Sequence, residues 1–298
     1  MRLINTSTQE LVSFPSHSPP PYAILSHRWS DSEIIFEDFE EGKLSNSGKR
    51  KLESYQKLQG TCREAVGDGL QWCWIDNCCI DKRHSAELQE SINSMFNWYK
   101  AAAICYVHLD VQFGGSVYDT LKSSSWITRG WTLQELLAPE RLHIFDNSWS
   151  HIGCKSELME PLSEASGIPA EALADNRNIQ NYSIAQRMSW ASLRETYIPE
   201  DIAYCLLGIF DVYMPMLYGE GRLCAFHRLQ EEIIKKSNDP TIFIWRHTDP
   251  EKPIHSILAD EPSFFLDSHD VIIDDSPYSV DTYPFSMTNI GLKIKASI

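Results

Sequence analysis

Short apolar segments alternate with amphipathic helical segments along the first half of this sequence, and this alternation limits the folds that the chain can adopt. Four apolar runs have the length of buried strands, and the patterns between them have the period of helices. Strand and helix in regular alternation predict a parallel sheet covered by helices on both faces. The predicted strands span residues 22–25, 72–76, 103–109 and 141–145, and the predicted helices between them span 49–66, 85–101 and a segment within 124–139.

Polar side chains stand where the predicted strands end. In open parallel sheets, ligands bind at the carboxyl ends of the strands. We therefore expect these side chains to line a site at one edge of the sheet. They are Ser26, His27, Arg28 and Trp29 after the first strand, Asp76 at the end of the second and Asp110 after the third.

Glu135 is an acid within a short, largely apolar helical segment. The segment opens with hydroxyl residues, Ser124 and Ser125, which are suited to capping a helix, and Pro139 favours its end. A carboxylate in such a place is either solvated or there for chemistry. We favour chemistry, and the alternative is a surface glutamate with a solvated or salt-bridged head.

The second half of the chain has a different pattern. Helices are predicted at 155–166, 184–192 and 222–236, and a further helix begins at Pro199. After Pro240 the apolar residues recur with a period of two, at Ile242 and Ile244 and again at 290, 292 and 294, which predicts strands. The chain stops within one of them, so we expect the native protein to continue past residue 298. The predicted parts are a lead-in at 1–21, an α/β part at 22–150, a helical part at 151–238 and a β-rich segment at 239–298.

The charge and the cysteines limit the compartment and the partners. The formal net charge is −15, which disfavours nucleic acid and anionic membranes as partners. No run of eighteen apolar residues predicts a membrane span, and no apolar signal region opens the chain. The eight cysteines lie mostly inside apolar runs, as reduced thiols do in intracellular proteins. We expect a cytoplasmic protein.

Five sequence blocks resemble the fungal heterokaryon-incompatibility (HET) domain, in the order of that family. The resemblance runs from about residue 22 to residue 236. It implies an effector of heterokaryon incompatibility and programmed cell death that self-associates or acts with an incompatibility partner protein. The blocks span residues 22–29, 74–82, 94–99, 129–136 and 200–212.

The first half, roughly 22–150, is also similar to Toll/interleukin-receptor (TIR) domains. The similarity rests on a strand that ends near Ser26 and Arg28, and on the helical segment 131–136. It implies a flavodoxin-like parallel sheet, and it implies that Glu135 is the catalytic residue of an NAD-cleaving enzyme. The chain departs from the TIR pattern at Cys78 and Cys79, and its helical second half has no TIR counterpart.

Cleavage of the nicotinamide–ribose bond needs few catalytic groups. The leaving group is already a cationic pyridinium, so one carboxylate that stabilises the oxocarbenium-like state can suffice. NAD is then the substrate, and no cofactor or metal is required. The alternative to an NAD glycohydrolase is a non-enzymatic death-signalling module that acts by self-association or by partner recruitment, with Glu135 as a surface or interface residue.

The remaining candidates each have a structural alternative. Arg28 can hold a phosphate or form a salt bridge to an acid nearby, at Asp31 or Glu33. His27 is more often structural than catalytic. Asp76 can bind ribose hydroxyls or cap its own loop.

The aromatic and thiol candidates are also open to two interpretations. Trp29 and Trp131 can stack on the nicotinamide or the base, although core packing is favoured for Trp131. Cys79 lines the predicted site. Pairing with a histidine as in a cysteine protease has little support, because such signatures do not transfer between families.

Overall fold

The computed structural model describes residues 1–247, 256–273, 285–288 and 291–293. The chain divides into two compact units, residues 1–176 and 177–298, and each is described by itself. The predicted part boundaries at 21, 150 and 238 remain predictions.

The first unit is built on a seven-stranded sheet with the order β2-β1-β6-β3-β7-β8-β9. Its strands are β1 (Arg2–Asn5), β2 (Leu11–Ser13), β3 (Ala23–His27), β6 (Trp72–Trp74), β7 (Ile104–His108), β8 (Leu142–Phe145) and β9 (His151–Cys154), and β4 (Phe39–Glu40) pairs with β5 (Lys43–Leu44) apart from them. Its helices are η1 (Phe36–Asp38), α1 (Asn46–Lys49), α2 (Leu52–Gly67), α3 (Asp76–Cys79), α4 (Ser85–Ala101), α5 (Val117–Ser123), α6 (Thr132–Leu137), α7 (Met159–Ser166) and α8 (Ala170–Ala174).

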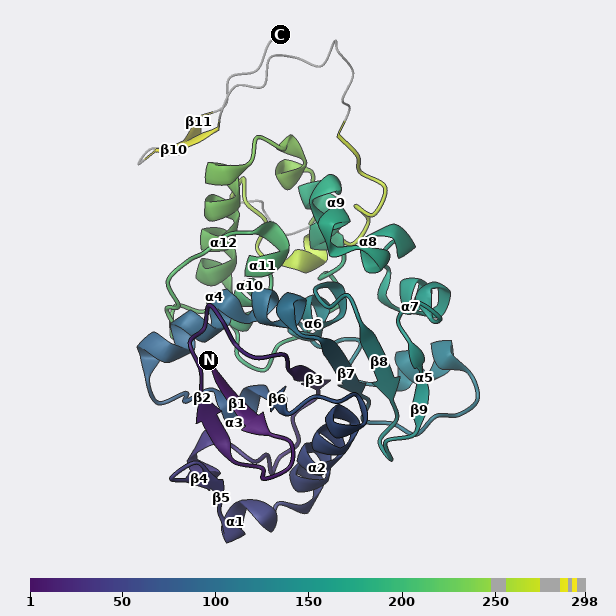
Figure 1. Cartoon of the computed structure of the whole chain (residues 1–298). Coiled ribbons are helices and arrows are strands. Elements are labelled where there is room, and N and C mark those ends of the chain that lie inside the picture. Colours follow the sequence, from purple (N-terminus) through teal and green to yellow (C-terminus); the bar gives the residue numbers. More distant parts are fainter. Residues whose placement is uncertain (248–255, 274–284, 289–290, 294–298) are drawn as a thin grey trace. The chain divides into compact units, whose positions relative to one another are not determined.

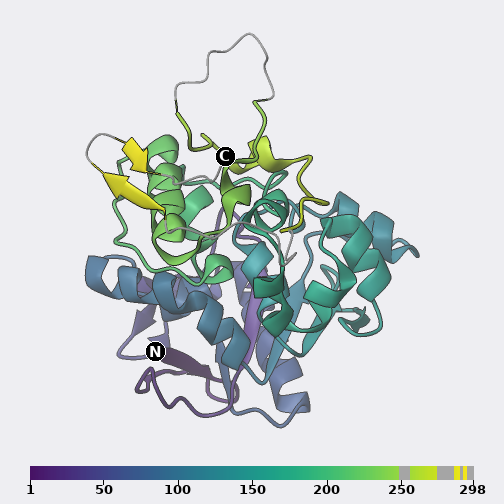
Figure 2. The same cartoon turned by 90° about the horizontal axis from the view of Figure 1, so that it is seen from above.

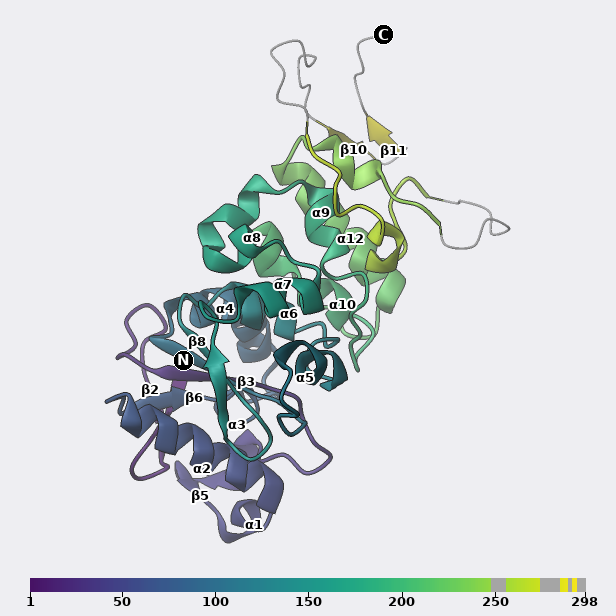
Figure 3. The same cartoon turned by 90° about the vertical axis from the view of Figure 1, so that its right-hand side faces the viewer.

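The centre of the sheet is parallel, as the alternation predicts. Strands β6, β3, β7 and β8 pair in parallel, and β3 and β7 are buried along their whole length. Continuous apolar strands suit a sheet that is covered on both faces. Helix α2 covers one face and α4 and α6 cover the other (Figures 1 and 3). The mixed α/β architecture is consistent with the flavodoxin-like class that the resemblance implies.

The order of the parallel strands creates a switch point between β3 and β7. The chain leaves β3 for β6 on one side and then crosses to β7 on the other side. In doubly wound sheets a crevice opens at the carboxyl ends of the two strands where the order reverses. This is the edge at which the sequence places Ser26, His27 and Asp110.

Antiparallel strands extend the parallel core on both sides. Strand β1 pairs with β6 and with β2, and β9 pairs with β8. Strands β2 and β9 do not follow from the pattern of the sequence. Their pairing depends on long-range contacts that a periodic pattern does not contain.

The second unit is mostly helical. Its elements are η2 (Asn176–Asn181), which begins at the last residue of the first unit, α9 (Ile184–Ser189), α10 (Asp201–Tyr204), α11 (Leu207–Phe210), α12 (Arg222–Lys236), η3 (Pro240–Phe243), η4 (Pro262–Phe265), β10 (Ser286–Thr288) and β11 (Gly291–Lys293). Helix α12 contacts α10, and the antiparallel β10–β11 pair lies beside α12 (Figures 1 and 2).

Three local predictions are wrong. Ser124 and Ser125 do not cap the start of α6, because that helix begins at Thr132 and both serines bind Asp110, while Ser124 ends α5. The single helix expected from Pro199 is two short helices, α10 and α11. Hydrogen bonds between residues three apart, such as Leu206 N–H to Ala203 O, interrupt the α-helical hydrogen bonding.

The third wrong prediction concerns the strand expected at Ile242 and Ile244. The structure has the 3-10 helix η3 there, and the Asp239 carboxylate caps it by accepting from the backbone N–H of Thr241. Residues 290 and 294 of the predicted tail lie outside the described residues, whereas residue 292 is in β11. Among the described residues, no helix has the length and apolarity needed to cross a membrane.

Candidate functional site

Glu135 lies against the end of β3 through a direct hydrogen bond. The Ser26 hydroxyl donates to Glu135 Oε2 at 2.5 Å and accepts from Trp126 Nε1 at 2.8 Å. Ser26 is fully buried and Glu135 is only 6% exposed. The carboxylate therefore faces the protein interior at the switch point, and the surface alternative for Glu135 is wrong.

Burial changes the acidity of this carboxylate. Loss of hydration raises the pKa of Glu135 to about 7, although the Ser26 hydroxyl and the Arg129 guanidinium act in the opposite direction. The charge of Asp76 adds to the rise. A carboxyl group with such a pKa exchanges its proton near neutral pH, which is typical of catalytic sites.

Trp29 is half-exposed and contacts Asp76 and Arg129, two residues whose charges act on Glu135. Its indole Nε1 donates to Asp76 Oδ2 at 2.8 Å. Two cations lie on its ring, with Lys82 Nζ 3.6 Å and Arg129 Cζ 4.7 Å from the centroid. The ring contacts that we expected to serve a base or nicotinamide are thus made by protein cations. Asp76 also accepts from the backbone N–H of the next residue, Asn77, at 2.8 Å.

The pleat of β3 sends Ser26 and His27 to opposite faces of the sheet. His27 is 4% exposed, and its Nε2 lies 3.8 Å from Glu33 Oε2. Glu33 in turn accepts from Lys57 Nζ of α2 at 2.6 Å. His27 therefore belongs to a buried charged group on the α2 face, away from Glu135, and the structural interpretation of His27 fits this place.

A pocket of about 460 Å³ opens on the α2 side of the switch point. We call it the switch-point pocket. It is bounded by the residues that follow three parallel strands and by α2. Its lining residues are Arg28, Trp29, Ser30, Glu53, Lys57, His108, Asp110 and Asn147.

Arg28 lines this pocket with an exposed side chain. Among the described residues it forms no ion pair with Asp31 or Glu33. Glu33 is committed to Lys57 instead, so the salt-bridge alternative for Arg28 is not realised.

Two other candidates, Cys79 and Trp131, lie where a packing role explains them. Cys79 is buried in α3, and burial raises the pKa of its thiol to about 12. Such a thiol is almost entirely protonated at neutral pH and is a poor nucleophile. Trp131 is 9% exposed and precedes α6 as its N-cap residue, which fits a packing role.

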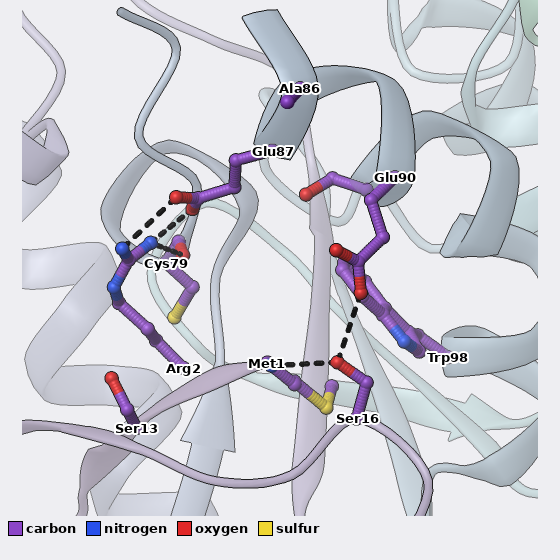
Figure 4. A pocket seen from close by; sticks show the side chains of 10 residues that line it. Met1, Arg2, Ser13, Ser16, Cys79, Ala86, Glu87, Glu90 and Trp98 are labelled. Carbon is purple, nitrogen blue, oxygen red and sulfur yellow. Dashed lines mark hydrogen bonds and ion pairs between the residues drawn. The ribbon is translucent and has the colours of Figure 1, made fainter. Parts of the chain in front are cut away.

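A second pocket, of about 300 Å³, lies where β1 approaches α4 (Figure 4). Its charged groups are paired within it. Arg2 binds Glu87 through both guanidinium ends, and Ser16 links the Met1 amino group to Glu90. The charged groups of this pocket are therefore engaged with protein partners.

One protein-family model matches part of the first unit. Residues 22–116 match the family described as Heterokaryon incompatibility protein (HET). The chain carries a HET domain. The matched segment contains Ser26, Trp29 and Asp76, whereas Glu135 lies after its last residue.

One curated relative extends the HET similarity beyond that segment. The chain is 40% identical over 265 residues to Vegetative incompatibility protein HET-E-1 of Podospora anserina. The similarity covers 86% of this chain and 19% of that relative, so the chain spans a small part of the relative's length. No solved structure matches the chain.

Several residues that complete the site were not predicted from the sequence. Trp126 holds Ser26 from the other side, and Lys82 and Arg129 lie on Trp29. A buried tryptophan usually has a hydrogen-bond acceptor for its N–H, so burial of Trp126 would predict a polar neighbour. Nothing in the sequence shows that this neighbour is Ser26, a hundred residues away.

Proposed function

We propose that this HET-domain chain acts in fungal heterokaryon incompatibility and cell death by cleaving the nicotinamide–ribose bond of NAD. The observation that carries the proposal is the placement of Glu135, a buried carboxylate with a pKa near 7 bonded to Ser26 at the switch point. The incompatibility role is supported by the HET match and by the similarity to HET-E-1.

Glu135 supplies the charge that the reaction needs. As nicotinamide leaves, positive charge develops on the ribose, and a carboxylate in a dry site stabilises it far more than it would in water. The ionised form of Glu135 performs this role. Ser26 fixes the position of the carboxylate through its hydroxyl, and Trp126 fixes the hydroxyl.

Substrate reaches Glu135 only after its surroundings rearrange, because the residue is 6% exposed. The half-exposed side chain of Trp29 is the part that moves. This side chain is held by its hydrogen bond to Asp76 and by its cation–π contacts with Lys82 and Arg129. A closed resting state of this kind prevents cleavage of NAD until a trigger or assembly opens the site.

The test is nicotinamide release from NAD by the purified chain, over a range of protein concentrations and with a crowding agent. We expect release by the intact chain and a loss of about 100-fold or more in Glu135→Gln, since removal of one charge-stabilising group typically has this effect. Glu140→Gln is the matched control, because Glu140 is an exposed glutamate just after α6. It should retain full activity.

Two outcomes decide against the proposal. Absence of release under all these conditions removes the enzymatic function and favours a death-signalling module that works by association. Equal release by Glu135→Gln and the intact chain keeps the activity but removes Glu135 from its centre.

A further inference from the structure

The switch-point pocket is a second polar site, distinct from the surroundings of Glu135. It opens on the α2 side, where His108 and Lys57 line it, whereas Ser26 and Glu135 meet on the α6 side. Trp29 lines the pocket and also binds Asp76 beside the carboxylate. Its volume of about 460 Å³ is within the usual range of small-molecule sites.

The charges in the lining indicate how much negative charge a ligand can carry. Two cations, Arg28 and Lys57, stand against two carboxylates, Glu53 and Asp110. Lys57 is held at 2.6 Å by Glu33, and Glu53 is 3.5 Å from the same ammonium. Arg28 is therefore the cation available for a ligand, and its guanidinium fork matches one phosphate group.

Asp110 does not stand as an unsatisfied anion in the pocket. It accepts from the Ser124 and Ser125 hydroxyls, and from the Ser125 backbone N–H at 3.1 Å. These donors disperse its charge and lower its repulsion toward a phosphate.

The other lining groups suit the uncharged parts of a nucleotide. The exposed Asn147 amide offers a donor and an acceptor, as the edge of a base requires. The Glu53 carboxylate, in the first turn of α2, can accept hydrogen bonds from ribose hydroxyls. Burial lowers the pKa of His108 to about 4, so its imidazole is neutral. Because the ring also bonds to the Asn147 backbone, it has at most one nitrogen left for a ligand.

We propose that the switch-point pocket binds a nucleoside 5′-phosphate, with the phosphate on Arg28 and the nucleoside against Glu53, His108 and Asn147. The balanced lining selects a single phosphate over a triphosphate. Such a group has two possible sources. It is either the adenosine-phosphate end of an NAD molecule that extends past Trp29 from the Glu135 side, or a separate mononucleotide that regulates the domain.

The test is calorimetric titration of the whole chain with AMP, adenosine and inorganic phosphate. We expect AMP to bind at least about ten-fold more tightly than adenosine or phosphate alone, since each part of the nucleotide contributes contacts. Arg28→Gln should weaken AMP about ten-fold or more and leave adenosine unchanged. Arg50→Gln is the matched control, because Arg50 is an exposed arginine outside the pocket, and it should leave AMP binding unchanged.

The inference is overturned if AMP does not bind, if phosphate alone binds as well as AMP, or if Arg28→Gln and Arg50→Gln weaken AMP equally. The side chain of Arg28 is exposed, so these variants keep the fold, and thermal unfolding verifies this.

Competition in the Glu135→Gln variant distinguishes the two sources. If NAD displaces AMP and Arg28→Gln weakens both, the pocket holds the adenosine end of the substrate. If NAD and AMP bind together, the pocket is a separate regulatory site. Glu135 does not line the pocket, so AMP binding persists in Glu135→Gln even if the intact chain releases no nicotinamide. Failure of the proposed function and failure of this inference are thus told apart.

Discussion

At the residue scale, the ionisation of Glu135 connects the stability of the fold with pH. The pKa of Glu135 is raised from 4.5 to about 7 in the folded chain, mainly by burial. The folded state therefore holds this proton more tightly than the unfolded state does. Stability contributed by the protonated form is complete below pH 4.5 and is lost as the pH rises through 7. The loss amounts to about 3 kcal/mol.

Glu135→Gln removes this loss, because the amide does not ionise and its oxygen can still accept from Ser26. We expect the variant to gain stability relative to the intact chain as the pH rises from 5 to 8, by about 2.5 kcal/mol. Urea unfolding of both proteins at the two pH values measures the difference. A stability difference that is the same at both pH values contradicts the burial-driven rise in the pKa of Glu135.

The thiols give a second prediction at this scale. Burial raises the pKa of Cys79 to about 12, whereas Cys224 is exposed. In the folded chain we expect a thiol reagent to modify Cys224 rapidly and Cys79 only after unfolding. Mass spectrometry of the modified peptides measures the two rates. Rapid labelling of Cys79 in the folded protein reopens its assignment as a reactive residue.

At the scale of elements, the position of Glu135 depends on the carboxyl end of α6. Lys155, which is 5% exposed, holds this end by donating to the carbonyls of Leu136 at 2.8 Å and Pro139 at 3.1 Å. The carbonyls at a helix end need such partners. Burial lowers the pKa of Lys155 to about 8, which is the cost of placing an ammonium there.

Lys155→Ala leaves those two carbonyls without their donor. We expect a loss of about 2 kcal/mol in the free energy of unfolding and a lower rate of nicotinamide release, since α6 is less firmly held. Lys122→Ala, at an exposed lysine of α5, should change stability by less than about 0.5 kcal/mol. Thermal unfolding and the release assay measure both effects. An unchanged Lys155→Ala protein shows that α6 does not need this contact.

Elements whose pattern is local were predictable, and elements that depend on distant partners were not. Helix α4 and the parallel strands follow the apolar periodicity. The serines before α6 have the composition of helix caps, yet the Asp110 carboxylate binds them, and only the fold brings Asp110 there. Likewise, Asp239 turns the segment with Ile242 into a 3-10 helix despite its period of two.

At the scale of the whole molecule, the topology explains how much of the site could be foreseen. Parallel strands deliver their carboxyl ends to one edge, so the grouping of Ser26, Asp76 and Glu135 followed from the order of elements. The division between the two faces did not, because it depends on the pleat of β3, which directs Ser26 toward Glu135 and His27 toward α2. The contacts of Lys82 and Arg129 with Trp29 could not be predicted either, since the two cations come from separate loops.

The proposed function requires an ionised Glu135 that stabilises the cationic transition state, and the pH dependence of nicotinamide release is its critical test. The pKa of Glu135 is about 7 in the closed structure, so the rate constant should rise with pH through about 7 and level off above it. The same profile in Glu140→Gln and its disappearance in Glu135→Gln complete the prediction. A rate that is independent of pH between 5 and 9, or that falls as the pH rises through 7, contradicts the assignment of Glu135 as the catalytic carboxylate.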